Sequence, residues 1–426
     1  MKYAVLVVMV GLAVGTALLP EREVAELDPV PASEVPPVAI CPIVESGDNH
    51  TAVSVLSSVN GQGRLSTFAA GTETGAVEFR TGGSGAVTVP AADADALGVA
   101  GGLIEMPSET TAAGVVTSGP GSRTAEVCAD TPTAQVFISG GSTITGSIFE
   151  IQLINPYAGE ASVDLNVTSD AGVESSDRFN AVVVPPLSTI TLDLTQIIPG
   201  REAIAAQIET TRGSVLAYGR QTIDGRRALW RAVAPRQDWW LPVPPGGGTK
   251  QMRIANPGSA EVEYQVDLYG PDGFVEGYDT GVIDARGSVT VPLAAITADE
   301  VAVGVTTTGP VVPLLWIDSP EGLARTTASE VDAPVWLLPG ASLPPGGSAT
   351  ITVLNSGIET VTVSVRSLSD RSIARDLEVG AEEVLTVDLV AADGYRVEAT
   401  GPVVALWTSS HGGTGTAAMG IPLQDG

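Results

Sequence analysis

One stretch of the sequence concentrates side chains that can bind an anion or a sugar. Between residues 201 and 236 there are seven arginines and only three acids. Arginine binds phosphate or carboxylate groups through paired hydrogen bonds, and the face of a tryptophan stacks on sugars or cations. The predicted ligand-binding residues are Arg220, Arg226, Arg227, Arg231, Arg236, Trp230, Trp239 and Trp240. A second interpretation is structural: the arginines neutralise neighbouring acidic segments, and the tryptophans fill contacts between domains.

Alternation along a strand decides how these side chains are presented. Residues two apart face the same side of a β-strand. Arg227, Leu229 and Arg231 are therefore predicted on one face and Trp230 on the other.

The residues that most catalytic and metal sites require are scarce in this chain. It has two histidines and two lysines, too few for histidine-rich zinc sites, conventional Ser-His-Asp triads or most lysine Schiff-base schemes. No P-loop, complete dinucleotide glycine motif, G-x-S-x-G elbow or C-x-x-C pair occurs. We therefore predict no metal, no cofactor and no enzymatic activity. A glycan hydrolase with a carboxylate pair is the least favoured alternative, because 49 acids can still meet in space.

The elements that must position these residues recur several times along the chain. An asparagine turn recurs at Asn155-Pro156, Asn256-Pro257 and Asn355-Ser356, in steps of 101 and 99 residues. Glycines at 114, 213, 309 and 401 precede a late apolar strand at similar spacing. A repeat of this length is typical of one domain used several times in tandem.

Inside a repeat, apolar residues recur with a period of two. Val262, Tyr264, Val266 and Leu268 alternate with polar residues, as in a strand with one buried face. The 49 glycines and 30 prolines suit many tight turns. We predict an all-β fold of four tandem immunoglobulin-like β-sandwich repeats, at residues 39–133, 134–238, 239–335 and 336–426. A β-propeller of about eight blades is the alternative, because half-repeats near 50 residues would suit blades.

The two cysteines, Cys41 and Cys128, bracket the first repeat. We predict a disulfide between them, which would add about 4 kcal/mol by closing a long loop. Disulfides form in exported proteins. The pair therefore indicates an oxidising compartment.

The N-terminus predicts export. Lys2 precedes an apolar run from residue 4 to residue 19, which is slightly short for a membrane helix and typical of a signal-peptide core. Residues 1–20 are interpreted as a cleaved signal peptide or a signal anchor after which the chain lies outside the membrane. Residues 21–38 contain four prolines and five acids and are interpreted as an extended tether.

The net charge of −28 argues against a nucleic-acid partner, because binding to a phosphate backbone depends on lysine and arginine. The leading hypothesis is a non-enzymatic, exported cell-envelope scaffold or binding protein, either anchored to the cell membrane or secreted. Its partner would be an envelope polymer or a protein. The alternative is a binder of an anionic envelope polymer or glycan through the Arg/Trp-rich second repeat.

The whole pattern resembles a family of exported actinobacterial proteins with a domain of unknown function. The resemblance is carried by the apolar N-terminus, the proline-rich tether, the Trp-Leu-Pro and Trp-Leu-Leu-Pro segments at 240–242 and 336–339, the asparagine turns, and Gly-Pro-Val-Val at 309 and 401. Two lysines against nineteen arginines are similar to a high-GC coding bias. The resemblance implies an envelope location and a link to cell-surface glycan assembly, and it supplies no catalytic residues.

Overall fold

The structure of the chain is a computed structural model. It describes residues 38–44, 50–57, 60–81, 85–90, 99–106, 111–119, 122–129, 132–270, 273–293, 301–320, 322–339, 347–368, 374–390, 394–411 and 414–423. The predicted signal segment at 1–20 and the tether, up to residue 37, lie outside these residues. In the described part of the chain, no helix has the length and apolar character needed to cross a membrane.

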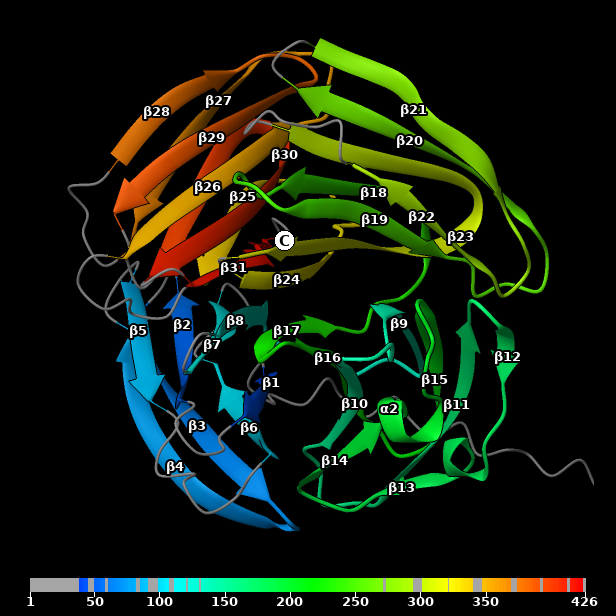
Figure 1. Ribbon diagram of the computed structural model, residues 1–426. Helices are drawn as coiled ribbons and strands as arrows, with labels where there is room; N and C mark the ends of the chain where they lie inside the picture. Colours follow the sequence, from blue (N-terminus) through cyan, green and yellow to red (C-terminus); the bar gives the residue numbers. More distant parts are fainter. Residues whose placement is uncertain are drawn as a thin grey trace, which may run out of the picture. The chain divides into compact units, whose positions relative to one another are not determined.

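The all-β prediction is confirmed, since strands make up nearly the whole described chain (Figure 1). The helical elements of the described residues are the short α2 (Leu194–Ile197) and the 3-10 turn η2 (Asp177–Phe179). Every sheet takes its strands from one of four consecutive stretches of chain. We call these stretches the first to fourth strand sets.

The first strand set forms two four-stranded sheets. One sheet has the order β1 (Val38–Val44), β6 (Val99–Glu105), β3 (Gly61–Ala69) and β4 (Thr72–Thr81). The other has the order β5 (Gly85–Pro90), β2 (His50–Ser57), β7 (Thr111–Gly119) and β8 (Ser122–Val127).

The second strand set repeats this plan. One sheet has the order β12 (Gly172–Glu174), β11 (Ala161–Ser169), β15 (Ile204–Arg212) and β9 (Gln135–Gly141), with β13 (Val182–Val184) also paired to β11. The other has the order β14 (Ser188–Asp193), β10 (Ser147–Asn155), β16 (Leu216–Ile223) and β17 (Arg226–Arg231).

In the third and fourth sets, one long strand passes through both sheets. The third set contains β18 (Arg236–Val243), β19 (Thr249–Ala255), β20 (Val262–Gly270), β21 (Gly273–Ile283), β22 (Ser288–Pro292), β23 (Val301–Ser319) and β24 (Gly322–Thr327). The fourth contains β25 (Ala333–Pro339), β26 (Ser348–Asn355), β27 (Val361–Ser367), β28 (Ala374–Val379), β29 (Glu383–Val390), β30 (Gly394–His411), β31 (Thr414–Met419) and β32 (Ile421–Pro422). The long strands are β23 and β30.

The two sheets of a set share one core, as in a β-sandwich. In the second set, Phe149 and Ile151 of one sheet and Leu165 and Val167 of the other belong to a single buried cluster. Successive strands also cross between the sheets, because β2 pairs with β5 and β7 rather than with β1 or β3. A propeller blade would instead join consecutive strands. The pairing therefore favours the sandwich over the propeller alternative.

The asparagine turns fasten the two ends of a sandwich sheet. Asn256 is buried, and its Nδ2 donates to the carbonyls of Ala260, Ile283 and Asp284 while its Oδ1 accepts from the N–H of Gly258. Asn155 and Asn355 make the same four kinds of bond in their own sets. The side chain therefore caps its turn and also binds a second turn about 30 residues further along the chain.

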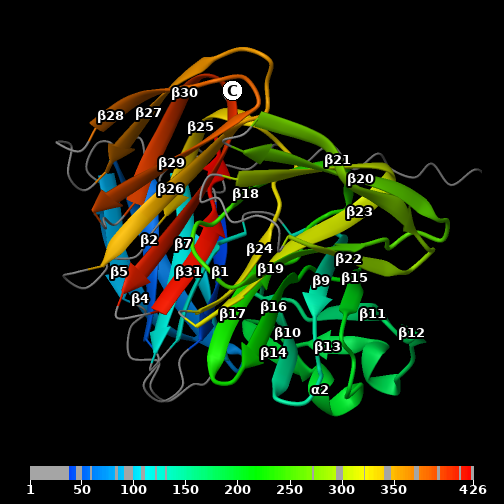
Figure 2. The same ribbon diagram turned by 45° about the horizontal axis from the view of Figure 1, so that its top comes forward.

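One strand near the end of each set contacts those of the neighbouring sets in a closed cycle within Pro37–Gly426. β8 contacts β17, β17 contacts β24, β24 contacts β31, and β31 contacts β8 (Figures 1 and 2). We call the contact between the first and second sets the first seam, and number the second, third and fourth seams in chain order. The fourth seam joins the fourth set back to the first.

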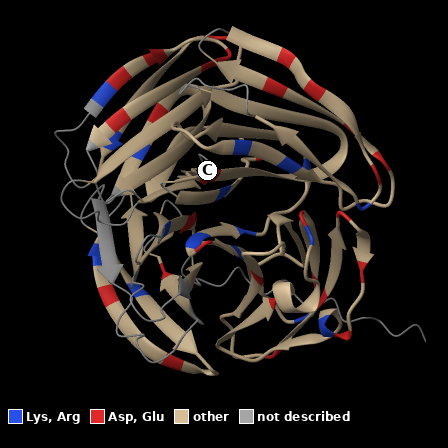
Figure 3. Cartoon of the chain, in the orientation of Figure 1, with Lys and Arg blue, Asp and Glu red and all other residues tan. Residues whose placement is uncertain are grey.

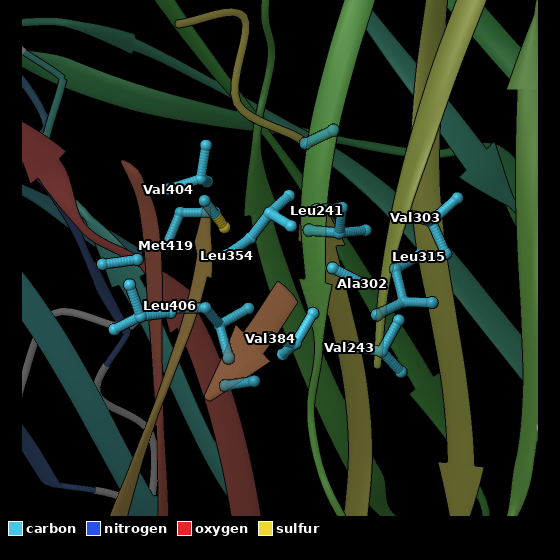
Figure 4. Packing of buried hydrophobic residues seen from close by; sticks show 14 of the residues in the cluster. Leu241, Val243, Ala302, Val303, Leu315, Leu354, Val384, Val404, Leu406 and Met419 are labelled. Atoms are coloured by element: carbon cyan, nitrogen blue, oxygen red, sulfur yellow. The ribbon is translucent and has the colours of Figure 1, made fainter. Parts of the chain in front are cut away.

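Apolar packing continues across the seams. One buried cluster includes side chains of both the third and the fourth set. Figure 4 shows Leu241 of the third set beside Leu354 of the fourth. The sets are therefore joined by core-like contacts.

Candidate functional site

The tryptophans of the predicted Arg/Trp site are mostly core residues. Trp230 is fully buried and stacks on Phe149, with ring centroids 5.7 Å apart and planes 6° apart. Trp239 is also buried, and its Nε1 donates to the carbonyls of Arg236 and Val311. Trp240 is half-buried. The rings of Trp230 and Trp239 therefore have no free face for a ligand.

Several arginines of the predicted site bind acids. Arg220 pairs with Glu150 at 2.6 Å, and Arg236 pairs with the exposed Glu330. Arg226 binds Asp318 and the carbonyl of Ser319, so it joins the second set to the third. Figure 3 shows basic residues on β17 and β19 and acidic residues along β20, β21 and β28.

The two faces of β17 divide as predicted. Leu229 packs in the buried cluster of the first set, whereas Trp230 packs in the cluster of the second. Arg227 shares the face of Leu229, and burial together with the nearby Arg220 lowers its pKa. The structure thus brings Arg220 and Arg227 together on the side that faces the first set. Arg236 lies on β18 of the third set.

The predicted disulfide is present, because Cys41 and Cys128 are bonded. Cys41 lies in β1, and Cys128 follows β8. The bond joins the first and last strands of the first set within its buried cluster.

The second seam contains a stack of cations that sequence analysis did not find. The guanidinium carbons of Arg253 and Arg325 lie 3.7 and 3.0 Å from the ring centroid of Trp316. Burial lowers the pKa of Arg253 to about 10 and lowers that of Arg325 as well. Arg253 also donates to the carbonyl of Glu202 at 2.9 Å, which ties the third set to the second. Cation-π contacts of desolvated arginines are worth about 2 kcal/mol, which offsets part of the cost of burying the two guanidinium groups.

The first seam contains a buried acid. The carboxylate of Glu126, on β8, accepts hydrogen bonds from the backbone N–H groups of Val127, at 2.8 Å, and Arg231, at 3.1 Å. Burial raises the pKa of Glu126 to about 7, against the opposing effect of the positive charge of Arg231. This carboxyl group therefore changes charge near neutral pH.

A groove of about 280 Å³ opens at the second seam. Its walls are the outer face of β11 and β15 in the second set and the asparagine turn of the third set. Phe137, Val173, Pro257 and Val312 are apolar lining residues. The polar side chains in the lining that have no hydrogen-bond partner in the described residues are Asn166, Thr168, Gln207, Ser259 and Arg286. Sequence analysis did not predict this groove.

Within the described ranges, no group of three or more His, Cys, Asp or Glu residues is placed to hold a metal ion.

Comparison with known proteins gives a family and little else. The model of a protein family described as a family of unknown function (DUF5719) matches residues 105–228 and 230–420. No curated protein matches the sequence. A solved structure titled "Crystal structure of tetra-tandem repeat in extending region of large adhesion protein" is similar at 9% identity, over 90% of this chain and 98% of that one. Its TM-score is 0.11, a likeness that supports no inference about fold or function.

Proposed function

The chain belongs to the DUF5719 family of unknown function, and we propose that it is a non-enzymatic, exported scaffold or binding protein of the cell envelope. In this proposal, each strand set is one immunoglobulin-like domain. The sets begin at Val38, Gln135, Arg236 and Ala333, within three residues of the predicted domain starts at 39, 134, 239 and 336. Residues 1–20 act as a signal peptide or membrane anchor, and residues 21–38 as a tether. The lysine-poor, arginine-rich composition supports an actinobacterial source.

The observation that carries the proposal is the closed cycle of contacts between β8, β17, β24 and β31. Sets joined in series by linkers alone would be free to move relative to one another. Here, seams contain buried apolar side chains, a cation stack and ion pairs, which hold neighbouring sets in one orientation. Such a framework suits a protein that presents surfaces, and the net charge of −28 favours solubility outside the membrane.

Location and activity test this proposal separately. In intact cells of the source organism, external protease should degrade the full chain, and the chain should fractionate with the membrane or the medium. A chain protected in the cytosol would contradict export. Purified protein incubated with envelope glycans should release no new reducing ends. Turnover that one Asp→Asn or Glu→Gln change abolishes would favour the carboxylate-pair hydrolase instead.

The second candidate is an anionic-polymer binder that uses the arginines of the second set. Because the rings of Trp230 and Trp239 are buried, only the arginines could bind the polymer. Arg227 and Arg231 are half-buried on β17. It predicts affinity that falls with salt and falls again in Arg226→Ala, Arg227→Ala and Arg231→Ala combined. Unchanged polymer binding in that triple variant would remove it.

A further inference from the structure

Corresponding residues can be matched across the strand sets because their sheets share order and register. Thr168 pairs with Ala205 in the second set, as Phe68 pairs with Gly101 in the first. In the third set, Tyr269 pairs with Ala302. In the fourth, the N–H of Leu368 donates to the carbonyl of Gly394, which continues the register of the same two strands. Phe68, Thr168, Tyr269 and Leu368 are therefore equivalent positions.

At the first and fourth seams this position faces the end of the second strand of the next set, β10 or β2. A Cβ atom added to Gly101 would lie 3.0 Å from Ile154 of the second set, and one added to Gly394 would lie 2.3 Å from Leu56 of the first. Ile154 directly precedes the asparagine of its turn, and Leu56 precedes the corresponding residue Ser57. The equivalent residues in the third and fourth sets are Ala255 and Leu354.

Three seams are filled by large apolar pairs and one is not. The filled seams carry Phe68 with Ile154, Tyr269 with Leu354, and Leu368 with Leu56, and all six side chains are buried. The second seam carries Thr168 with Ala255. Both residues are smaller than their counterparts, so the space that an aromatic or leucine side chain fills elsewhere is open here. The small side chains of Thr168 and Ala255 are therefore the physical origin of the groove.

A strained turn places one more side chain at three of the four seams. Leu187, Arg286 and Glu382 all have a positive φ, at 46°, 56° and 54°. Their N–H groups donate to the carbonyls of equivalent turn residues, Tyr157, Gly258 and Gly357. The shared backbone directs side chains of different chemistry to the preceding set. At the first seam Leu187 packs on the apolar cluster, whereas at the second seam Arg286 lines the groove.

The groove has polar side chains at positions where other strand sets have apolar ones, and the described residues supply no hydrogen-bond partners for these side chains. Gln207 stands where the first set has Leu103, and Arg286 stands where the second set has Leu187. Among the described residues Arg286 has no ion-pair partner, and the lining contains no acid. Asn166, Ser259 and Arg286 are exposed, and Thr168 and Gln207 are half-buried, so their hydrogen-bonding groups are accessible to a ligand.

We propose that this groove binds a sugar acid: a polyhydroxylated ring that carries a carboxylate. Asn166 and Gln207 both donate and accept, which suits adjacent sugar hydroxyls, and Arg286 can bind a carboxylate through paired hydrogen bonds. Phe137 and Pro257 supply apolar surface for the C–H face of the ring. A volume of about 280 Å³ lies just below the range for drug-sized ligands and suits one or two sugar rings.

Other ligand classes fit less well. An apolar ligand would leave the amides and the guanidinium unpaired, at a cost of about 1 to 3 kcal/mol for each group. A phosphate usually recruits several cations, and Arg286 is the single cation of the lining. This inference rests on the proposed binding role and assigns it a place and a ligand class.

The test is binding of defined probes to the full chain by calorimetry. The probes are glucuronate, its neutral match glucose, and a glucuronic-acid-containing hexasaccharide. We expect saturable binding of glucuronate, at least tenfold tighter than that of glucose. Tighter binding of the hexasaccharide would identify a glycan as the source of the sugar acid, and equal binding would identify the free sugar. Either outcome supports the groove.

Variants locate the binding. Arg286→Ala should weaken glucuronate binding about tenfold or more and remove its advantage over glucose, whereas Arg178→Ala, an exposed arginine of the second set outside the groove, should leave binding unchanged. Thr168→Phe should fill the groove as Phe68 fills the first seam and abolish binding of all probes. Should Thr168→Phe unfold, Gln207→Ala tests the same wall.

Two results would overturn the inference. One is a folded wild-type chain that binds none of the probes. The other is glucuronate binding that Arg286→Ala and the groove-wall variants leave unchanged. Neither result bears on export or on the cycle of seams, so a failure here is distinguishable from a failure of the scaffold proposal.

Discussion

Glu126 is expected to make the stability of the chain depend on pH. Its carboxyl group is fully buried at the first seam, with a pKa near 7 in the folded chain against an ordinary value of 4.5. The groups that face it are the backbone N–H groups of Val127 and Arg231 and the positive charge of Arg231. Burial outweighs these interactions, so the folded chain holds the proton more tightly than the unfolded chain.

The size and sign of the effect follow from that difference. A shift from 4.5 to about 7 corresponds to about 3 kcal/mol. Because the folded pKa is the higher one, this stability is fully present below pH 4.5. It is lost as the pH rises through 7, where the folded chain must ionise the buried group. Glu126→Gln stays neutral at every pH, so it should not show the loss of about 3 kcal/mol that wild type shows between pH 4.5 and 8. Its absolute stability should be lower than that of wild type at pH 4.5, because the amide has one accepting oxygen for the two N–H groups that bind Oε1 and Oε2 of Glu126.

Urea unfolding between pH 4.5 and 8, followed by tryptophan fluorescence, measures the effect. The matched control is Glu263→Gln, which changes an exposed glutamate on β20 and should keep the wild-type pH profile. The reasoning is refuted if Glu126→Gln and wild type lose stability in parallel over this range.

Three further changes test other parts of the structure. Asn256→Ala removes an amide that satisfies three carbonyls and one N–H, so the free energy of unfolding in urea should fall by about 2 to 3 kcal/mol, and a loss below 0.5 kcal/mol would contradict the capping role. Cys41→Ser should lower the stability of the first set by about 2 to 5 kcal/mol, as measured by thermal unfolding. Cys128→Ser removes the same disulfide and should cause an equal loss. Arg325→Met should be neutral or stabilising, because Nε and Nη2 of the buried guanidinium have no hydrogen-bond partner, and a loss above about 3 kcal/mol would show that its charge is needed.

The repeated parts of the fold were predictable because their signals are local. The period of two along β20 and the asparagine before each turn depend on neighbours in sequence. The disulfide was also predictable, since the chain has one cysteine pair. The Arg/Trp run was harder to interpret, because spacing alone does not show that Trp230 faces the core of its own set.

The seams were beyond the reach of such signals. Arg253, Trp316 and Arg325 meet only because β19, β23 and β24 pair in one register, and no local pattern marks residues so far apart. The sequence does contain a signal for the groove, but it lies in the size of a side chain and not in the spacing of the repeats. The residue before the asparagine is Ile154 or Leu354 in two copies and Ala255 in the third. Side-chain size at matched positions, compared between copies, would have indicated the open seam.

The closed cycle is tested most directly at the fourth seam, where the fourth strand set meets the first. Nε of Arg123 donates to Oγ of Ser409 at 3.2 Å, across 286 residues of sequence. A double-mutant cycle of Arg123→Ala and Ser409→Ala on the full chain measures their coupling. The structure predicts a coupling free energy of about 0.5 to 1.5 kcal/mol. Additive effects, as expected for residues held far apart in an open array of domains, would contradict the account.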